Sequence, residues 1–285
     1  MADDPNRLTE GTQPYPGSSG EMTPEPRDEM RDYTGRGLLA GRRALVTGGD
    51  SGIGRAVAVA FAKEGADVAI AYLEEHDDAR HTAGLVEAEG RRAVLIPGDL
   101  SRRPACDHAV SETVDKLGGL DLLVNNVAFQ APADSLEEIS DEQLECTFRT
   151  NIFSYMWTTR TALRHMGEGS AIVNTGSVNG LRGNKSLIDY ATTKGAVHTF
   201  TYSMAQALAD RKIRINCVAP GPVWTPLIPA TMSEEKVRSF GEQTPFGRPA
   251  QPDELAPSYV FFASELSSYS TGEVLGALGG ETHPG

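Results

Sequence analysis

The sequence predicts an α/β protein with a single doubly wound parallel sheet of about seven strands, helices on both faces and an extended N-terminal arm. Three observations lead to this fold class. Short apolar segments alternate with helical segments along most of the 285 residues. The apolar segments are nearly continuous, which is typical of strands buried on both faces of a sheet. A glycine-rich turn follows the first strand, where sheets of this class bind ligands.

Residues 1–40 form the predicted arm, because they are rich in Pro, Gly, Ser, Asp and Glu and show no apolar periodicity. Two interpretations remain open. Either the arm is disordered, or its apolar residues pin it across a neighbouring surface, which would make it an oligomerisation device. The residues available for the second interpretation are Tyr15, Met22, Met30, Tyr33, Leu38 and Leu39.

Residues 41–285 form one predicted domain of alternating strands and helices. The predicted strands are 44–47, 67–72, 92–96, 120–124, 171–175, 213–218 and 273–278. The predicted helices are 55–64, 77–89, 104–117, 141–166, about 190–210 and 253–264. Right-handed crossovers between such strands give a parallel sheet with ligands at the carboxyl ends of the strands.

Residues 222–252 interrupt this alternation with several prolines and glycines. The segment is long for a connection. We therefore predict a mobile lid over the active cleft, and we expect substrate contacts in it.

Composition excludes several classes of function. The 39% hydrophobic residues suffice for a large core, and the net charge of −13 argues against nucleic-acid or anionic-membrane partners, which require a basic face. The three cysteines, Cys106, Cys146 and Cys217, are too few for a disulfide framework and favour a reducing, cytoplasmic environment. The chain start lacks the pattern of a signal peptide, and no apolar run approaches the ~18 residues of a membrane span.

The six histidines are dispersed without the spacing of metal ligands, so we expect no metal site. They are His76, His81, His108, His165, His198 and His283.

The glycine-rich turn Gly48-Gly49-Asp50-Ser51-Gly52-Ile53-Gly54 lies between the first strand and the first helix. Glycines there allow a tight turn and a close approach to a pyrophosphate, whose charge is favoured by the free amides at a helix N-terminus. A tight turn with close helix packing explains the same spacing equally well. Its position after the first strand is what nucleotide binding requires.

Ser177, Tyr190 and Lys194 suggest one proton-handling unit. Tyr190 and Lys194 are four residues apart on a predicted helix and therefore share a face. Ser177 follows a buried strand that would deliver it to a cleft. Tyr and Lys at this spacing also occur by chance, so the rest of the chain must support the interpretation.

Taken together, these features resemble the short-chain dehydrogenase/reductase family over about residues 40–280. The matching motifs, in the family's order, are the cofactor turn 47–54, Asp99, Asn125-Asn126-Val127-Ala128, Asn151, the spacing of Ser177, Tyr190 and Lys194, and Pro220-Gly221 followed by Thr225. The arm, the turn and the run 125–130 resemble more narrowly an N-terminally extended bacterial subgroup of stress-associated oxidoreductases related to glucose and aldehyde dehydrogenases. One departure is Val127-Ala128, where the family usually has Ala-Gly.

The resemblance implies a Rossmann-type fold and an NAD(P)-dependent oxidoreductase that acts on the CH–OH group of donors, moving hydride between nicotinamide and a carbonyl or alcohol. It also implies a homotetramer. The implied cofactor contacts are Gly48, Asp50, Ser51, Gly52, Ile53, Gly54, Tyr72, Asp99, Leu100, Asn126, Tyr190, Lys194, Pro220, Gly221, Val223 and Thr225.

The implied catalytic residues are Asn151, Ser177, Tyr190 and Lys194. Tyr190 would be the general acid and base. The charge of Lys194, backed by the oxidised nicotinamide, is expected to lower the pKa of its phenol from about 10 toward the working pH. Ser177 would hydrogen-bond the substrate oxygen, and Asn151 would hold a water that relays protons from Lys194.

Two questions remain open at the level of sequence. The choice between NAD and NADP is undecided, because Tyr72 and Leu73 occupy the positions where the family usually has an acidic or a basic residue, while Arg55 could help either cofactor. The substrate is unknown. An alternative from another class is an NAD(P)-binding sensor or structural protein without turnover; an epimerase would usually have a larger C-terminal domain.

Overall fold

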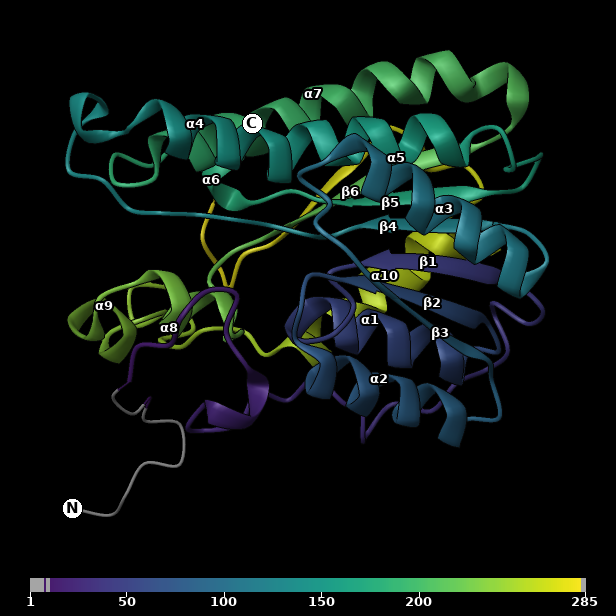
Figure 1. Cartoon of the computed structure of the whole chain (residues 1–285), viewed down its shortest axis with the longest axis horizontal. Coiled ribbons are helices and arrows are strands. Elements are labelled where there is room, and N and C mark those ends of the chain that lie inside the picture. Colours follow the sequence, from purple (N-terminus) through teal and green to yellow (C-terminus); the bar gives the residue numbers. More distant parts are fainter. Residues whose placement is uncertain (1–7, 9–10, 283–285) are drawn as a thin grey trace.

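A seven-stranded parallel sheet forms the centre of the chain (Figure 1). The structure is a computed structural model and describes Leu8 and residues 11–282. The strand order is β3-β2-β1-β4-β5-β6-β7. The strands are β1 Arg43–Thr47, β2 Asp67–Tyr72, β3 Ala93–Pro97, β4 Leu122–Asn125, β5 Ala171–Thr175, β6 Arg214–Pro220 and β7 Val274–Ala277. The predicted fold class is therefore confirmed.

Helices cover both faces of the sheet. In Figure 1, α3, α5 and α7 lie on one face, and α1, α2 and α10 lie on the other. The helices are α1 Gly52–Lys63, α2 His76–Ala88, α3 Arg103–Leu117, α4 Asp141–Phe148, α5 Ser154–Ala162, α6 Val178–Arg182, α7 Ile188–Leu208, α8 Leu227–Thr231, α9 Glu234–Arg238 and α10 Pro252–Ala263. Among the described residues, none of these helices combines the length and the hydropathy of a membrane span.

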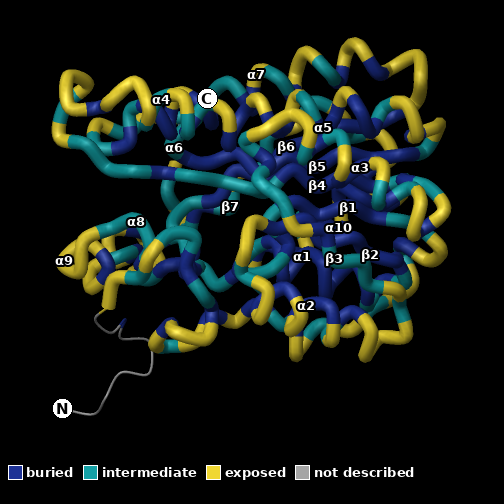
Figure 2. The backbone as a smooth tube through the Cα atoms, viewed as in Figure 1, coloured by how far each residue is buried: buried dark blue, intermediate teal, exposed yellow. Residues whose placement is uncertain are grey.

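The strands are mostly apolar because their side chains pack into hydrophobic cores on both faces of the sheet. Ala44 and Val46 of β1 face the helices α1 and α10, whereas Leu45, between them, packs with α3 on the opposite face. This alternation is the two-residue period of a strand. Figure 2 shows the result, with buried strands in the interior and exposed residues on the outer sides of the helices.

Some predicted bounds differ from the structure. α1 begins at Gly52 and not at Arg55, because its first turn includes two glycines of the turn, which have low helix propensity. The predicted helix 141–166 is α4, a π-helical segment Arg149–Phe153 and α5, which ends at Ala162. The short helices α6, α8 and α9 are too short to give a periodic pattern.

The described part of the arm packs against its own domain, which neither sequence interpretation anticipates; residues 1–7 and 9–10 lie outside the described part of the chain. Met30 and Leu39 join the core beneath α1 and α10, and Met22 packs with Trp224. The Glu64 carboxylate, at the end of α1, accepts hydrogen bonds from the backbone amides of Arg36 and Leu38. In Figure 1 the arm runs beside α8 before it passes under the sheet domain.

The glycine-rich turn depends on Gly54. A Cβ atom at this position would lie 1.8 Å from the carbonyl oxygen of Gly48, so only glycine lets α1 start this close to the end of β1. Gly48 itself has a φ of 62°, a conformation that glycine adopts without strain.

We therefore predict that Gly54→Ala lowers the free energy of unfolding by about 3 kcal/mol, the upper range for overpacking, because backbone atoms cannot move aside as a side chain can. Urea unfolding measures the change. Gly84→Ala is the matched control: it lies in α2, and its new Cβ meets nothing within 4 Å. It should raise the free energy of unfolding by about 0.5–1 kcal/mol through helix propensity. Equal effects of the two changes would contradict the packing argument.

Candidate active site

A cavity of about 640 Å³ opens at the carboxyl ends of the strands. Its walls come from the turn after β1, the ends of β2 and β3, residues 126–128 after β4, Ser177 after β5 and Pro220 at the end of β6. The segment with α8 and α9 forms a further wall. A cavity of this size, at this edge of a parallel sheet, suits a cofactor together with a small substrate.

Most of the residues singled out from the sequence line this one cavity. Every proposed cofactor contact does so except Gly54, which packs under the turn. Ser177, Tyr190 and Lys194 line it as well. Asn151 does not; it is fully buried beside the cavity.

Lys194 is a buried cation, and its ammonium is held by two groups. Nζ donates to the carbonyl oxygen of Thr175 at 2.8 Å and to the hydroxyl of Tyr155 at 3.4 Å. It also lies 5.4 Å and 5.6 Å from the ring centroids of Tyr155 and Tyr190. Burial disfavours the charged form and lowers the pKa of Lys194 to about 8.

Tyr190 is buried as well, and this changes the expected direction of its pKa. Burial raises the pKa of Tyr190 to about 12, and a hydrogen bond with Ser177 opposes this rise. The sequence predicts that Lys194, together with an oxidised nicotinamide, lowers this pKa. In the structure, burial acts in the opposite direction and outweighs the hydrogen bond from Ser177. Tyr190 is therefore a neutral phenol at neutral pH.

Ser177 lies where strand β5 gives way to α6. It is the N-cap of that helix, and its Oγ accepts a hydrogen bond of 3.1 Å from the amide of Asn179. Its own amide points to Nε2 of His198 at 3.5 Å. Burial and the charge of Lys194 lower the pKa of His198 to about 4, which keeps the imidazole neutral as an acceptor.

The side chain of Asn151 helps to fix a loop. Its Oδ1 accepts from the amide of Phe129, and its Nδ2 donates to the carbonyl of Phe129, both at 2.8 Å. Nδ2 also donates to Oγ1 of Thr193 at 3.1 Å. The side-chain amide of Asn151 therefore positions the loop after β4.

Three polar side chains join the ends of neighbouring strands. Thr47 Oγ1 accepts from the amide of Asn126 at 2.9 Å, and Asn126 Nδ2 donates to the carbonyl of Gly48 at 3.0 Å. Thr175 Oγ1 donates to Asn126 Oδ1 at 3.1 Å. These hydrogen bonds fix the positions of the turn after β1 and the ends of β4 and β5 relative to one another.

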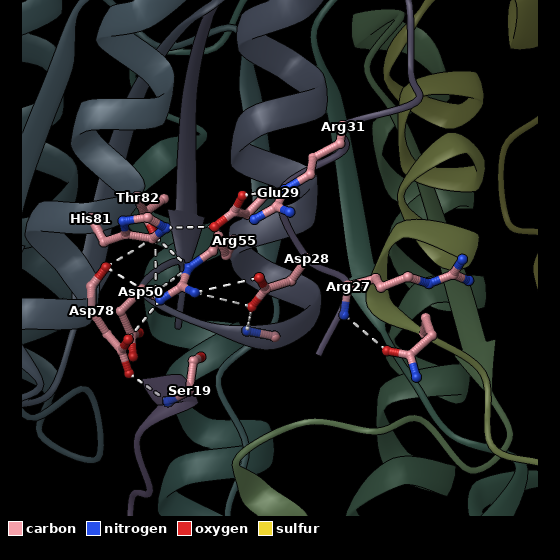
Figure 3. A network of polar contacts seen from close by, with 12 residues as sticks. Ser19, Arg27, Asp28, Glu29, Arg31, Asp50, Arg55, Asp78, His81 and Thr82 are labelled. Carbon is pink, nitrogen blue, oxygen red and sulfur yellow. Dashed lines mark hydrogen bonds and ion pairs between the residues drawn. The ribbon is translucent and has the colours of Figure 1, made fainter. Parts of the chain in front are cut away.

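Arg55 is not available to a cofactor, which corrects the sequence interpretation. It is 3% exposed, and its guanidinium pairs with Asp28 of the arm and Asp78 of α2. It also donates twice to the carbonyl oxygen of Asp50, at 2.8 and 3.0 Å. Figure 3 shows the guanidinium enclosed between these groups.

Sequence reasoning missed two tyrosines at the site. Tyr155 supports Lys194 and donates to the carbonyls of Val127 and Thr175; its position four residues after Asn151 on one helix was the available signal. Tyr15 of the arm lines the cavity, and nothing in its local sequence indicates this. Cys146 also lines the cavity, and burial raises the pKa of its thiol, so it is no thiolate nucleophile at neutral pH.

No cluster of His, Cys, Asp and Glu in the described part of the chain could hold a metal ion. All three cysteines are free thiols.

Comparisons with known proteins identify the family. A family model described as enoyl-(acyl carrier protein) reductase matches residues 48–282. A solved short-chain dehydrogenase from Burkholderia cenocepacia J2315, in complex with NADP, is 33% identical with a TM-score of 0.80 over 85% of this chain and 98% of that one. The chain belongs to the short-chain dehydrogenase/reductase family.

Two curated relatives in this family of oxidoreductases match nearly the whole chain. General stress protein 39 of Bacillus subtilis is 53% identical over 281 residues, which is 98% of each chain. The chloroplastic NADPH-dependent aldehyde reductase 1 of Arabidopsis thaliana is 48% identical over 272 residues, covering 93% of this chain and 94% of that protein. These matches extend into the arm, beyond the region that the family model covers.

The lowered pKa of Lys194 predicts a pH dependence of stability. At pH values between the folded-state pKa of about 8 and the ordinary pKa of 10.5, the unfolded chain binds more protons than the folded protein. The free energy of unfolding therefore rises with pH across this window. Relative to Lys194→Met, the wild-type protein should gain about 2–3 kcal/mol between pH 7.5 and pH 10.

Urea unfolding at both pH values measures this gain. Lys212→Met is the control, because that lysine is largely exposed and pairs with Glu168 on the surface. The free energy of unfolding of this variant should change with pH as that of the wild-type protein does. A constant difference between wild type and Lys194→Met would show that Lys194 keeps its ordinary pKa.

Proposed function

We propose that the protein is an NAD(P)-dependent oxidoreductase that acts on the CH–OH group of donors and moves hydride between nicotinamide and a carbonyl or alcohol. One observation carries the proposal: Ser177, Tyr190 and Lys194 converge on the same cavity as the glycine-rich turn. The cavity therefore offers a proton donor and an oxygen ligand beside a place for a dinucleotide.

The residues present fit such a cofactor. Gly48 and Gly52 both have positive φ and line the cavity, so bare backbone borders the space at the N-terminus of α1. A Cβ atom on Gly48 would lie 3.2 Å from Cα of Val127 and would crowd the loop after β4. Backbone amides and the helix dipole at such a turn favour a pyrophosphate. Asp99 and Leu100 would contact the adenine, and Asn126, Pro220 and Val223 the nicotinamide side.

The bound nicotinamide would supply or accept the hydride. In reduction, Tyr190 gives its phenolic proton to the substrate oxygen as the carbonyl carbon gains hydride, and the products are an alcohol and a phenolate. The phenolate then regains a proton from solvent. In oxidation, the phenolate takes the alcohol proton. Ser177 hydrogen-bonds the substrate oxygen and stabilises the charge that develops on it.

Lys194 serves this step through its charge. A phenol with a pKa of about 12 is a weak acid, and the nearby ammonium stabilises the phenolate as it forms. Asn151 acts as a positioning residue, because its side-chain amide fixes Phe129 in the loop that borders the cavity.

The form of the cofactor is left as NAD or NADP. The cavity lining near Tyr72 carries the carboxyl groups Asp50, Glu75 and Asp99, which disfavour a ribose phosphate. The names of the aldehyde reductase and of the solved relative favour the phosphorylated cofactor. Because one relative is named an aldehyde reductase, aldehydes are the first substrate class to test. A sensor without turnover has no support in these relatives.

We also propose a homotetramer in the cytoplasm, with no nucleic-acid or membrane partner. Three large apolar side chains, Phe153, Met156 and Tyr202, are 40–44% exposed on the outer side of the π-helical segment, α5 and α7. The π-helical segment packs against α7. Burial of this surface against a second copy would remove the apolar groups from water.

Tyr190→Phe should lower kcat for aldehyde reduction by about 10²- to 10⁴-fold, the usual contribution of a general acid. The affinity for NADH or NADPH should change little, because the ring remains. A panel of aldehydes, ketones and sugars, followed by nicotinamide absorbance, measures turnover. Tyr269→Phe, at a fully exposed tyrosine, should keep the wild-type rate.

Turnover that survives in Tyr190→Phe would show that another group supplies the proton. Binding of both cofactors with no turnover of any substrate in the panel would instead favour the sensor.

Met156→Glu combined with Tyr202→Glu should dissociate the tetramer, because the charged side chains would be buried at the interface. Light scattering measures the mass of the assembly. Leu136→Glu is the control, since Leu136 is 58% exposed and outside these helices. A wild-type protein that is monomeric would contradict the assembly proposed here.

A further inference from the structure

The N-terminal arm contributes to the cavity directly. Tyr15 and Pro16 line the same cavity as Ser177 and Tyr190. The ring of Tyr15 packs edge-on against Phe129, with centroids 5.2 Å apart and planes at 81°. Its hydroxyl donates to the carbonyl oxygen of Ala128 at 3.2 Å. A side chain from the start of the chain thus closes over the loop after β4.

The same arm segment is tied to the opposite wall. The amide of Gln13 donates to the carbonyl of Pro229 in α8 at 3.0 Å. The backbone at Gly17 approaches so closely that a Cβ atom there would lie 2.7 Å from the carbonyl of Pro226. Farther along, Trp224 Nε1 donates to the carbonyl of Pro24 at 2.8 Å. The arm therefore spans the opening from α8 to the loop after β4.

A buried carboxylate anchors the arm at the glycine-rich turn. Asp28 is 2% exposed, and its Oδ2 accepts from the amide of Gly52 at 3.1 Å and lies 3.3 Å from Nη1 of Arg55. On the other side of Arg55, Asp78 binds the guanidinium and also accepts from the amide of Ser19 at 2.9 Å. Figure 3 shows the arm held at both carboxylates.

These contacts place Tyr15 between the two halves of the proposed dinucleotide site. Its hydroxyl donates to the carbonyl of Ala128, on the nicotinamide side. Asp50 and Asp99, on the adenosine side, line the same cavity as Tyr15 and add to the rise in its pKa. Burial and these charges raise the pKa of Tyr15, so its phenol remains neutral where it lines the cavity. Asp99 and Asn126, which would hold a dinucleotide, line the same cavity as this ring.

We propose that Tyr15 is a further binding residue for the dinucleotide and that Asp28 is the positioning residue that holds the arm over it. The inference rests on the proposed function, since it takes the cavity to bind NAD(P). The arm covers the bound cofactor, and segment 13–17 must lift before the cofactor leaves. Cofactor release, not hydride transfer, is the step that the arm controls.

Stopped-flow displacement of NADH and NADPH, followed by nicotinamide fluorescence, tests the role of Tyr15. Tyr15→Ala should release the cofactor about three- to tenfold faster, the range for one aromatic contact. Tyr15→Phe keeps the ring on Phe129 and should release it within about twofold of the wild-type rate. Tyr269→Ala, at an exposed tyrosine, should leave the rate unchanged.

Asp28→Asn tests the anchor. It should speed release about as much as Tyr15→Ala does, and the double variant should release the cofactor no faster than the faster single variant, because both act through one arm. If the rate increases of the two single variants multiply in the double variant, Asp28 acts separately from Tyr15. That result would overturn the positioning role of Asp28.

Hydrogen exchange covers the case in which Asp28→Asn fails to fold. In the wild-type protein, cofactor binding should slow amide exchange across residues 11–33. Unchanged exchange there, or unchanged release by Tyr15→Ala from a protein that binds the cofactor, overturns the inference and leaves the proposed function standing. A wild-type protein that binds neither cofactor overturns both.

Discussion

The burial of one positive charge organises the site. Lys194 has no access to water, so its ammonium requires acceptors that the fold must supply: the carbonyl of Thr175 at the end of β5 and the hydroxyl of Tyr155 on α5. Meeting this requirement fixes the end of one strand and two helices relative to each other. The same arrangement places Tyr190, one turn before Lys194 on α7, at the wall of the cavity beside Ser177.

A second set of constraints shapes the cofactor side. Only glycine at position 54 lets α1 begin against the carbonyl of Gly48, and Asn126 then bonds that carbonyl from the end of β4. The arm adds Asp28 at the amide of Gly52. The turn is therefore held from the sheet on one side and from the first forty residues on the other, which gives the arm a physical connection to the site.

Local sequence predicted the elements whose signal is local. The bounds of β2 and β5 follow from buried apolar runs that end in polar or glycine residues, and the spacing of Tyr190 and Lys194 fixes their common face. What depends on distant partners could not be predicted. Tyr15 reaches Phe129 and Asp28 reaches Arg55 only in the folded chain, and the pKa of Tyr190 depends on burial that spacing does not reveal.

In the proposed function, hydride is transferred to a carbonyl carbon in this cavity. Nicotinamide cofactor with deuterium in place of the transferable hydrogen, labelled on each face of the ring in turn, tests it most directly in a single turnover with a simple aldehyde. We expect mass spectrometry to find one deuterium on the carbinol carbon of the alcohol product from one of the two labelled cofactors. Alcohol without deuterium from either labelled cofactor, or no alcohol with any aldehyde, would contradict it.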